Sequence, residues 1–483
     1  MAQSDGVTGK GLSSPWLAGA NLIDKLLDTN HPCHKVLTEE LTDDPEHGHL
    51  AEQFGGVRKK VNFKKAAKSV LNGLKFIKTD CAAAQGLASL KARIRQPEEV
   101  KGYLPPEWHN LSISRKSYVY RLLSYDVLKA WDYDSLELSV ACGENPLLFL
   151  GWAIICAPHA QRAMAASLGL EKPDIKDEDV YEFVDEFRMT PESCCNFLRL
   201  AENDYNPNPY HNNIHAADVT QTVFSLLQMG ADKYSTAPLE IFTLLFAAVC
   251  HDQGHPGTNN AFECNTRSDL SIIYNDSSVL ENMHSARAFR LLTHQADESN
   301  ANFLAGMQAT QRDAFRVIFT KAIMWTDMSL HFAKLAQLKA ILSSAGPDAP
   351  VEKFYINIEG RSIPLVLLIV LHIADISNPA KPSPIFVEWC DRLLNEGFAQ
   401  GDKEKKRALP VSPMCDREAT NRSDSQLGFI KYIVRPSFVL LSDLVPRVVN
   451  EILPIIQDNL NYWNEQKMAD EEAAAEVEEK VDS

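Results

Sequence analysis

The sequence lacks the closely spaced cysteines that build zinc-binding or disulfide-stapled modules. Its ten cysteines are scattered along the chain and form no CxxC pair. Cys194 and Cys195 are adjacent, which is a poor geometry for a mutual disulfide. This cysteine usage is typical of a protein from a reducing compartment.

Long hydrophobic runs are also missing. The longest apolar runs have about a dozen residues each, which is too short to cross a bilayer and typical of buried helices. They are Leu147–Ala157, Leu239–Cys250 and Ile363–Ala374. The N-terminus shows no basic-then-apolar signal sequence, and its second residue is alanine, so N-myristoylation is not signalled. We therefore expect a soluble, cytoplasmic protein without a transmembrane segment.

A surplus of basic residues is absent too. The formal net charge is −16, and part of it comes from an acidic tail at residues 466–483. This global acidity argues against non-specific nucleic-acid binding, which needs a basic surface. It does not exclude a small anionic substrate, because metal ions can supply positive charge locally.

What the sequence does contain is the pattern of an all-α protein. Long helical periodicities dominate from about residue 115 onward, strand-like alternation is scarce, and no repeat of fixed period occurs. The predicted helices include Pro238–Cys250, Ser268–Arg290, Arg312–Lys334, Ile363–Ile376, Ile385–Gln400 and Gln426–Ile456. We divide the chain into an irregular tail (1–56), a basic amphipathic segment with a linker (57–115), a compact multi-helix domain (116–465) and the acidic tail (466–483).

The basic segment 57–95 carries lysines around one apolar helical face, formed by Val57, Val61, Val70, Leu71, Leu74 and Ile77. Such a helix is typical of a segment that binds a calmodulin-like partner or a membrane surface. It is equally typical of a solvated helix that packs on its own domain and inhibits it. The sequence leaves these alternatives open.

Histidines and aspartates gather in the stretch 205–260. His211 and His215 are four residues apart, which places both imidazoles on one helix face, one turn apart. His251 and Asp252 follow the apolar run that ends at Cys250 and offer a neutral nitrogen beside an anionic oxygen. Mixed nitrogen and oxygen donors suit Zn²⁺ and also the harder ions Mg²⁺ and Mn²⁺. The stretch therefore predicts a metal-dependent hydrolase.

Asp375 is the best fourth donor. It ends a very apolar run, where a buried carboxylate is costly unless it is paired or metal-bound. The order of His215, then His251-Asp252, then Asp375 resembles the HD superfamily of metal-dependent phosphohydrolases.

Six motifs narrow this resemblance to one family. They are YHNNIHAADVTQT (210–222), HDQGHPGTNN (251–260), RSDLSIIYNDSSVLEN (267–282), TDMSLHF (326–332), HIADISNPAKP (372–382) and SQLGFIKYIVRPSF (425–438). Their order and spacing resemble those of the class I 3′,5′-cyclic nucleotide phosphodiesterases over residues 120–465. The residues within the motifs are most similar to those of the calmodulin-stimulated branch. The resemblance implies a compact helical catalytic domain.

The resemblance also implies the metal site. A tighter ion, usually zinc, would bind His215, His251, Asp252 and Asp375. A second ion, usually magnesium, with manganese as an alternative, would share Asp252 and otherwise bind waters. A layer around those waters would contain His255, His284 and Thr326, with Glu281.

The implied reaction hydrolyses the 3′-phosphoester bond of cAMP, and possibly cGMP, to a 5′-nucleoside monophosphate and so ends signal transduction. A hydroxide activated by two metal ions attacks the phosphorus. His211 serves as the general acid for the leaving O3′, with Glu281 holding it protonated and aimed.

The base pocket is implied by matching positions, namely Tyr210, Asn378, Leu393, Gln426 and Phe429. The amide of Gln426 can present a donor or an acceptor, so it does not choose between adenine and guanine. Phe386 stands where cAMP-selective relatives carry a tyrosine that locks this amide, and a phenyl ring cannot form that hydrogen bond. We expect use of cAMP or of both nucleotides rather than of cGMP alone.

Two departures and two rival functions accompany this interpretation. Met283 replaces a family histidine, and Trp325 replaces a small residue beside Thr326.

Two rival hypotheses remain. A non-catalytic cyclic-nucleotide sensor would bind the nucleotide without turnover, and another HD-type nucleotidase would be identified by an assay on linear nucleotides. The oligomeric state is open, a homodimer included.

Overall fold

The computed structural model describes residues 103–173, 175, 180–294, 300–358 and 360–481, all of which belong to one compact unit, Gly102–Ser483. The other unit, Met1–Lys101, lies outside the described residues. The predictions for the tail 1–56 and for a partner of the basic segment 57–95 therefore also lie outside them.

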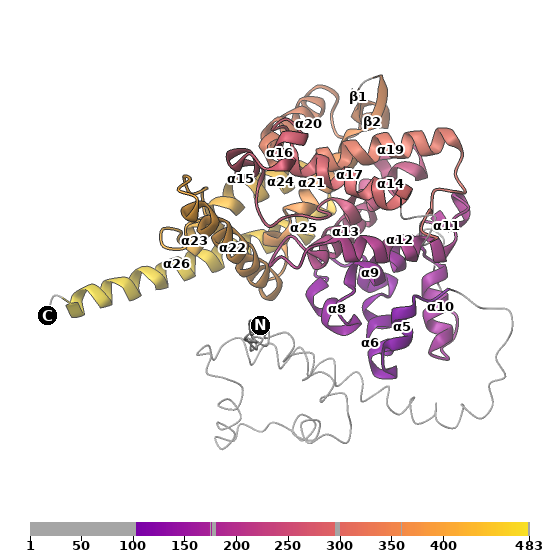
Figure 1. Ribbon diagram of the computed structural model, residues 1–483, viewed down its shortest axis with the longest axis horizontal. Coiled ribbons are helices and arrows are strands. Elements are labelled where there is room, and N and C mark those ends of the chain that lie inside the picture. Colours follow the sequence, from indigo (N-terminus) through magenta and orange to yellow (C-terminus); the bar gives the residue numbers. More distant parts are fainter. Residues whose placement is uncertain (1–102, 174, 176–179, 295–299, 359, 482–483) are drawn as a thin grey trace, which may run out of the picture. The chain divides into compact units, whose positions relative to one another are not determined.

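Helices dominate this unit, which confirms the predicted all-α class (Figure 1). The unit begins at Gly102, earlier than the expected domain start at residue 116. Pro106 occupies the first turn of a helix, where a missing N–H is tolerated, and Trp108 of that helix is fully buried. The first helices are α5 (Pro106–Asn110), α6 (Ile113–Leu122), α7 (Tyr125–Leu128), α8 (Ser135–Cys142), α9 (Pro146–Ile155), α10 (His159–Ser167), α11 (Phe183–Glu186) and α12 (Pro191–Asp204).

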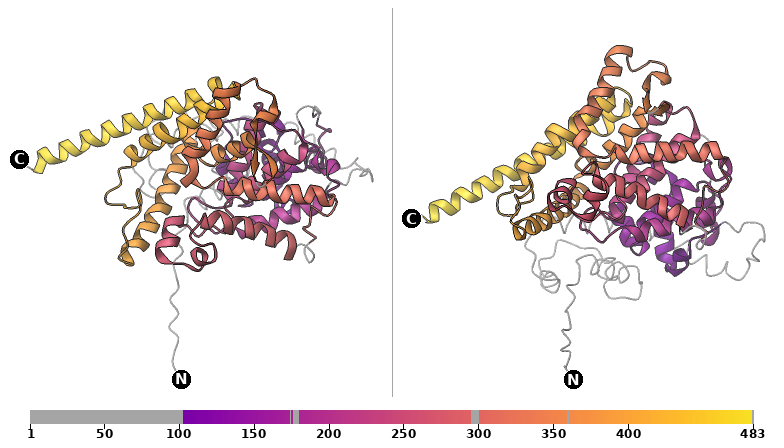
Figure 2. Two further views of the ribbon diagram at one scale, coloured as in Figure 1. Left: turned by 90° about the horizontal axis from the view of Figure 1, so that it is seen from above. Right: turned by 45° about the horizontal axis from the view of Figure 1, so that its top comes forward.

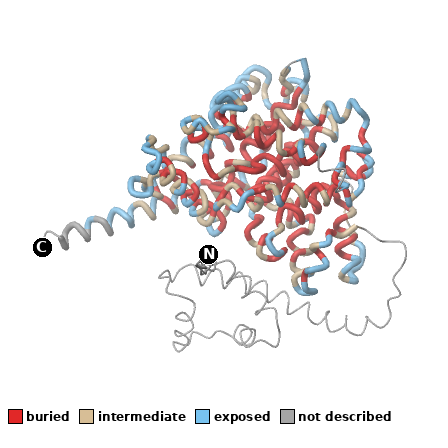
Figure 3. The backbone as a smooth tube through the Cα atoms, in the orientation of Figure 1, coloured by how far each residue is buried: buried red, intermediate tan, exposed pale blue. Residues whose placement is uncertain are grey.

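The middle of the chain forms the core that carries the histidines. Its elements are α13 (Asn213–Gln228), α14 (Pro238–Cys250), α15 (Asn260–Thr266), α16 (Asp269–Ile273), α17 (Val279–His294), α19 (Ala309–Met324), α20 (His331–Ala345) and α21 (Leu365–Asp375), with short 3₁₀ turns between some of them. Helix α13 packs against α9, α14 and α21, and α14 also packs against α19. Figure 3 shows these central helices as the most continuously buried part of the chain.

Burial of apolar side chains holds these helices in place. Every residue of α9 is buried, and so are Leu365 to Ala374 of α21. Since a fully buried Leu, Ile or Phe side chain contributes about 1.5–3 kcal/mol, the contacts among α13, α14 and α21 hold the ends of these helices in place relative to one another. Those ends carry the candidate ligands.

The C-terminal helices complete the unit. They are α22 (Ser383–Lys406), α23 (Arg422–Phe429), a π-helical turn (Ile430–Val434), α24 (Arg435–Ser442), α25 (Arg447–Glu451) and α26 (Leu453–Val481). Helix α26 packs against α23, with Lys467 of α26 paired to Asp424 of α23, and then continues past α22 and α23 (Figure 2). The acidic stretch from Met468 to Glu472 is exposed on it.

Three predicted helices are interrupted. The prediction Ser268–Arg290 is divided between α16 and α17, because Asn275, Asp276 and Ser278 adopt left-handed backbone angles between them. Arg312–Lys334 is divided between α19 and α20, and Gln426–Ile456 is divided into several helices.

A small hairpin was also missed. Strand β1 (Tyr355–Ile358) pairs antiparallel with β2 (Arg361–Pro364), and Ile358 faces Arg361. Gly360 adopts φ +80° in the turn, a conformation that glycine reaches without strain.

Within the described residues, no single helix has both the length and the apolar character to span a membrane. The pair α8 and α9 reaches that length and composition when taken together, across a bend of 107°.

Candidate active site

Three helix ends converge to form a cluster of two histidines and two aspartates. His215 lies in the first turn of α13, which is capped by Asn212: its side chain accepts from the backbone N–H groups of Ile214 (2.9 Å) and His215 (3.1 Å). His251 caps the C-terminus of α14, and Asp375 is the last residue of α21.

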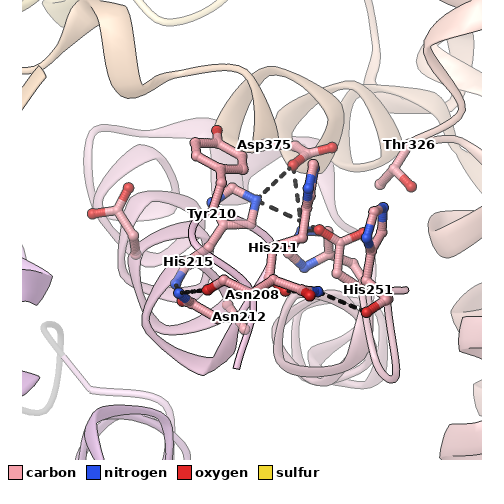
Figure 4. A network of polar contacts seen from close by, with 12 residues as sticks. Asn208, Tyr210, His211, Asn212, His215, His251, Thr326 and Asp375 are labelled. Carbon is pink, nitrogen blue, oxygen red and sulfur yellow. Dashed lines mark hydrogen bonds and ion pairs between the residues drawn. The ribbon is translucent and has the colours of Figure 1, made fainter. Parts of the chain in front are cut away.

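The facing atoms of this cluster are close together. Asp375 Oδ1 lies 3.1 Å from His215 Nε2 and 3.3 Å from His251 Nε2. Asp252 Oδ2 lies 3.3 Å from His251 Nε2 and 3.6 Å from His215 Nε2. One ligand atom from each of the four residues therefore lies within 4.8 Å of the others. Figure 4 shows Asp375 reaching from α21 toward His215 and His251.

Hydrogen bonding leaves two facing atoms of this cluster, one on His251 and one on Asp252, free for a cation. The Nδ1–H of His251 donates to the carbonyl of Ala248 (2.9 Å), so that Nε2 faces the aspartates. His251 Nε2 and Asp252 Oδ2 are buried without a hydrogen-bond partner among the described residues. Buried polar atoms without partners are costly, and two nitrogens with two carboxylate oxygens form a suitable tetrahedral donor set for a divalent ion. The residues present fit a bound metal.

The electrostatics indicate the same demand for positive charge. Burial favours the neutral form of His251, but Asp252 and Asp375 outweigh it and hold the pKa of His251 well above its ordinary value. Burial also opposes ionisation of Asp252, yet His251 holds the pKa of Asp252 well below its ordinary value. A divalent ion would replace the proton that His251 holds here.

His211 lies beside this cluster and is held by Glu396 of α22. Its Nδ1 contacts Glu396 Oε1, and Glu396 Oε2 accepts from the backbone N–H groups of Tyr210 (2.9 Å) and His211 (3.0 Å). Burial alone would lower the pKa of His211, but Glu396 raises it to about 9. In turn, burial opposes ionisation of Glu396 while His211 lowers the pKa of Glu396 to about 2. His211 is therefore protonated at neutral pH and presents Nε2.

The prediction that Glu281 aligns His211 is wrong, because Glu396 occupies that position. Glu281 accepts from the side-chain amide of Asn260 at 3.2 and 3.0 Å. Burial raises the pKa of Glu281 to about 7. No motif pointed to Glu396. Its signal in the sequence is a carboxylate on the inward face of α22, seven residues after Trp389 and three after Leu393 in the same stripe.

A stack of rings extends from His211. His255 lies parallel to His211, with ring centroids 4.0 Å apart, and His284 lies parallel to His255 at 5.6 Å. The Nδ1–H of His284 donates to the carbonyl of Gln253 (2.7 Å), which turns Nε2 toward Asp252 Oδ1 at 3.6 Å. Thr326, which is also buried, donates its hydroxyl to the carbonyl of Ile323 (2.8 Å).

The loop that carries His211 and the loop that carries His255 are joined by Asn208, which the sequence analysis did not identify. Asn208 Nδ2 donates to the carbonyls of His255 (2.7 Å) and His211 (2.9 Å). Gly257 has φ +70°, and a Cβ there would lie 2.9 Å from Asn208 Oδ1. The close approach of these loops therefore requires glycine at 257.

The candidate substrate residues fall into two groups. The hydroxyl of Tyr210 donates to Asn378 Oδ1, and Asn378 Nδ2 donates to Asp218 Oδ2 (2.8 Å). These two hydrogen bonds fix the orientation of the Asn378 amide. Leu393 packs on the apolar cluster that includes Tyr210 and Trp389.

The second group lies on α23. Gln426 is buried and Phe429 is partly buried there. Phe386 is buried edge-on against Tyr462 (5.4 Å) and Trp463 (5.8 Å) of α26. Among the described residues, no hydrogen bond or ring contact links Gln426, Phe429 and Leu393 to one another. Their shared role in binding the base therefore stays a prediction.

Comparison with known proteins gives one family. Residues 210–454, just over half of the chain, match the family described as 3′5′-cyclic nucleotide phosphodiesterase. The chain is 36% identical over 325 residues to the human dual specificity calcium/calmodulin-dependent 3′,5′-cyclic nucleotide phosphodiesterase 1C, covering 67% of this chain and 40% of that relative. It is 39% identical over 283 residues to 3′,5′-cyclic-AMP phosphodiesterase, isoform F, of Drosophila melanogaster, covering 58% and 42%. The chain thus spans less than half the length of these curated relatives.

Solved structures are similar as well. The phosphodiesterase domain of the RhoPDE fusion protein from the choanoflagellate Salpingoeca rosetta superposes with a TM-score of 0.55 at 30% identity, covering 62% of this chain and 94% of that one. LmjPDEB1 in complex with IBMX superposes with a TM-score of 0.59 at 23% identity, covering 74% and 99%, and shows a similar fold.

Proposed function

This chain belongs to the 3′5′-cyclic nucleotide phosphodiesterase family, and from that membership we propose that it hydrolyses 3′,5′-cyclic nucleotides. The bond broken is the 3′-phosphoester, and the product is a 5′-nucleoside monophosphate. The observation that carries the proposal is the convergence of His215, His251, Asp252 and Asp375 within 4.8 Å beside a histidine that Glu396 keeps protonated.

The metal site follows from the donor set. His215, His251, Asp252 and Asp375 would hold the tighter ion, for which two imidazoles and two carboxylates favour zinc. Asp252 has a second oxygen to share with a magnesium or manganese ion, near the layer of His255, His284, Thr326 and Glu281. When bound, such ions supply Lewis acidity and water activation at neutral pH.

The chain's own acid chemistry centres on His211. Because Glu396 accepts from Nδ1, the Nε2–H of His211 is available to donate a proton to the departing O3′. The His211 side chain is 27% exposed, so substrate can reach it, whereas the metal-facing histidines are buried. Parallel stacking on His255 restricts rotation of the ring and keeps Nε2 in one direction.

Both cAMP and cGMP are proposed as substrates. Gln426 would hydrogen-bond the base, and Leu393 and Phe429 would flank it. The Asn378 amide is fixed by Tyr210 and Asp218, so that its remaining lone pair and N–H present a defined pattern to the base. Phe386 offers no hydrogen bond to lock Gln426, which favours use of both nucleotides.

The test is turnover by the purified full chain with Mg²⁺ on cAMP and cGMP, compared with His211→Gln and with the matched control His109→Gln. His109 is exposed at the end of α5. We expect hydrolysis by wild type and by the control, and a loss of about 10²-fold or more in kcat for His211→Gln, in the range general acids contribute. Binding of both nucleotides without hydrolysis would contradict the proposal and favour a sensor. Hydrolysis confined to linear nucleotides would favour another nucleotidase.

Regulation by a calmodulin-like partner is a separate proposal. The relatives named above include a calcium/calmodulin-dependent enzyme, and segment 57–95 has the basic amphipathic pattern of a calmodulin target. We expect the full chain to be retained on immobilised calmodulin with Ca²⁺ and released by chelation. Equal retention of a variant that lacks residues 57–95 would contradict this role of the segment. If the full chain itself is not retained, the calmodulin proposal fails and the segment is better explained as a self-inhibitory helix.

A further inference from the structure

A hollow with a volume of about 430 Å³ lies between helices α17 and α19, apart from the candidate active site. The two helices pack against each other (Figure 1). From α17 it is lined by positions that share one helical face, among them Ser285, Phe289 and Arg290. From α19 it is lined by Arg316 and Thr320, one turn apart. None of the lining residues was given a role in the active site.

Two arginines face this hollow from opposite helices. Arg290 of α17 and Arg316 of α19 are both exposed. Neither forms an ion pair or hydrogen bond with any other residue that the structure describes. Instead, the guanidinium of Arg316 lies over the ring of Phe289, 4.2 Å from its centroid. This contact orients Arg316 without neutralising its charge.

The floor of the hollow is polar. Ser285 is 6% exposed, and its Oγ lies 3.5 Å from Thr320 Oγ1, at the limit of a hydrogen bond. Hydroxyl hydrogens rotate freely and can donate to a ligand. A buried hydroxyl with such a weak partner gains from an acceptor placed above it.

Charge and size together select the ligand. In a chain with 64 acidic and 48 basic residues, two facing arginines without a carboxylate partner form a local basic site. Guanidinium groups bind phosphate oxygens through paired, charge-assisted hydrogen bonds. The volume falls in the range of small-molecule sites, about 300–1,000 Å³, and the rings of Tyr274 and Phe289 add flat apolar surface.

We propose that the groove between α17 and α19 is a second binding site, for a small phosphate-monoester anion of mononucleotide size, with Arg290 and Arg316 binding the phosphate and Ser285 and Thr320 beneath it. The site is defined by binding and does not depend on the catalytic proposal.

The test is calorimetric titration of the full-length chain with 5′-AMP and, separately, with inorganic phosphate. The variants are the double substitution Arg290→Gln/Arg316→Gln and the control Arg361→Gln, which removes an exposed arginine of β2. The active site can also bind 5′-AMP, so the readout is stoichiometry. We expect wild type and the control to bind one more 5′-AMP per chain than the double variant binds, whether or not the active site is occupied as well. The weaker phosphate signal should fall by about tenfold or more, because the strong guanidinium contacts are lost.

A charge-conserving variant and two control measurements complete the test. Arg290→Lys/Arg316→Lys keeps the charge without the paired geometry, and should retain the second site with reduced affinity. Turnover of cyclic nucleotide and the unfolding temperature should match wild type in all variants, since these residues are exposed. Unchanged 5′-AMP stoichiometry in the double Gln variant would overturn the proposal. Arginine-dependent binding to vesicles of anionic phospholipid, without binding of 5′-AMP or phosphate, would overturn it too.

Discussion

Glu396→Gln separates the charge that holds His211 from the shape of the site. Glutamine keeps a carbonyl oxygen that can accept from the backbone N–H groups of Tyr210 and His211, but it removes the negative charge beside Nδ1. The pKa of His211 is about 9 because Glu396 outweighs burial. Without that charge, burial favours the neutral ring, and the pKa should fall to its ordinary value of about 6.5 or below.

The magnitude follows from the protonated fraction. The proposed acid acts in its protonated form, so activity is present below the pKa of His211 and lost as pH rises through it. At pH 7.5 wild type would be almost fully protonated, whereas a ring with pKa of about 6.5 would be protonated to about one tenth. We expect kcat/KM to fall about tenfold or more at pH 7.5, and much less at pH 6.

The assay is the pH profile of kcat/KM from pH 5.5 to 10 for wild type, Glu396→Gln and the control Glu388→Gln. Glu388 lies on the same helix and pairs with Arg392 rather than with His211. The alkaline limb should lie near pH 9 for wild type and the control, and near pH 6.5 for Glu396→Gln. An alkaline limb that does not move would refute the assignment of Glu396 as the group that sets the protonation of His211.

Three other substitutions test the scaffold. Gly257→Ala places a Cβ against Asn208 at φ +70°; we expect a loss of about 1 kcal/mol or more in unfolding free energy and a lower kcat, and an unchanged kcat would contradict the coupling of the two loops. Phe246→Ala empties a fully buried position of α14 and should cost about 3–5 kcal/mol in urea unfolding, whereas a cost below 1 kcal/mol would show that the core relaxes freely. Lys334→Met removes a buried ammonium that donates to two backbone carbonyls between α19 and α20; leaving them unpaired should cost about 1–3 kcal/mol each, and an equal unfolding midpoint would show that water replaces the lysine.

The fold class and the grouping of the four ligand candidates were accessible from the sequence for a physical reason. Apolar runs such as Pro238–Cys250 bury a whole helix, and a polar residue at the end of such a run is costly unless it has a partner. His251, Asp252 and Asp375 all stand at such ends, so their convergence with His215 could be anticipated without knowing the packing.

Other features were not accessible because they depend on tertiary contacts. Glu396 lies within a long amphipathic helix, where a single inward carboxylate differs from a surface acid by its burial alone. The break between α16 and α17 depends on left-handed angles at Asn275 and Asp276, which asparagine and aspartate tolerate but do not require. Pro106 lies in the segment 57–115, where the sequence predicted a linker, although proline is equally suited to the first turn of a helix.

The central claim is that His215, His251, Asp252 and Asp375 bind one ion together. Its most direct test is the metal content of the purified full-length chain by elemental analysis, for wild type, Asp375→Asn and the exposed control Asp458→Asn. We predict one tightly held divalent ion per chain in wild type and in the control after exhaustive dialysis, and a loss of most of it in Asp375→Asn. Equal metal content in all three proteins would contradict the account.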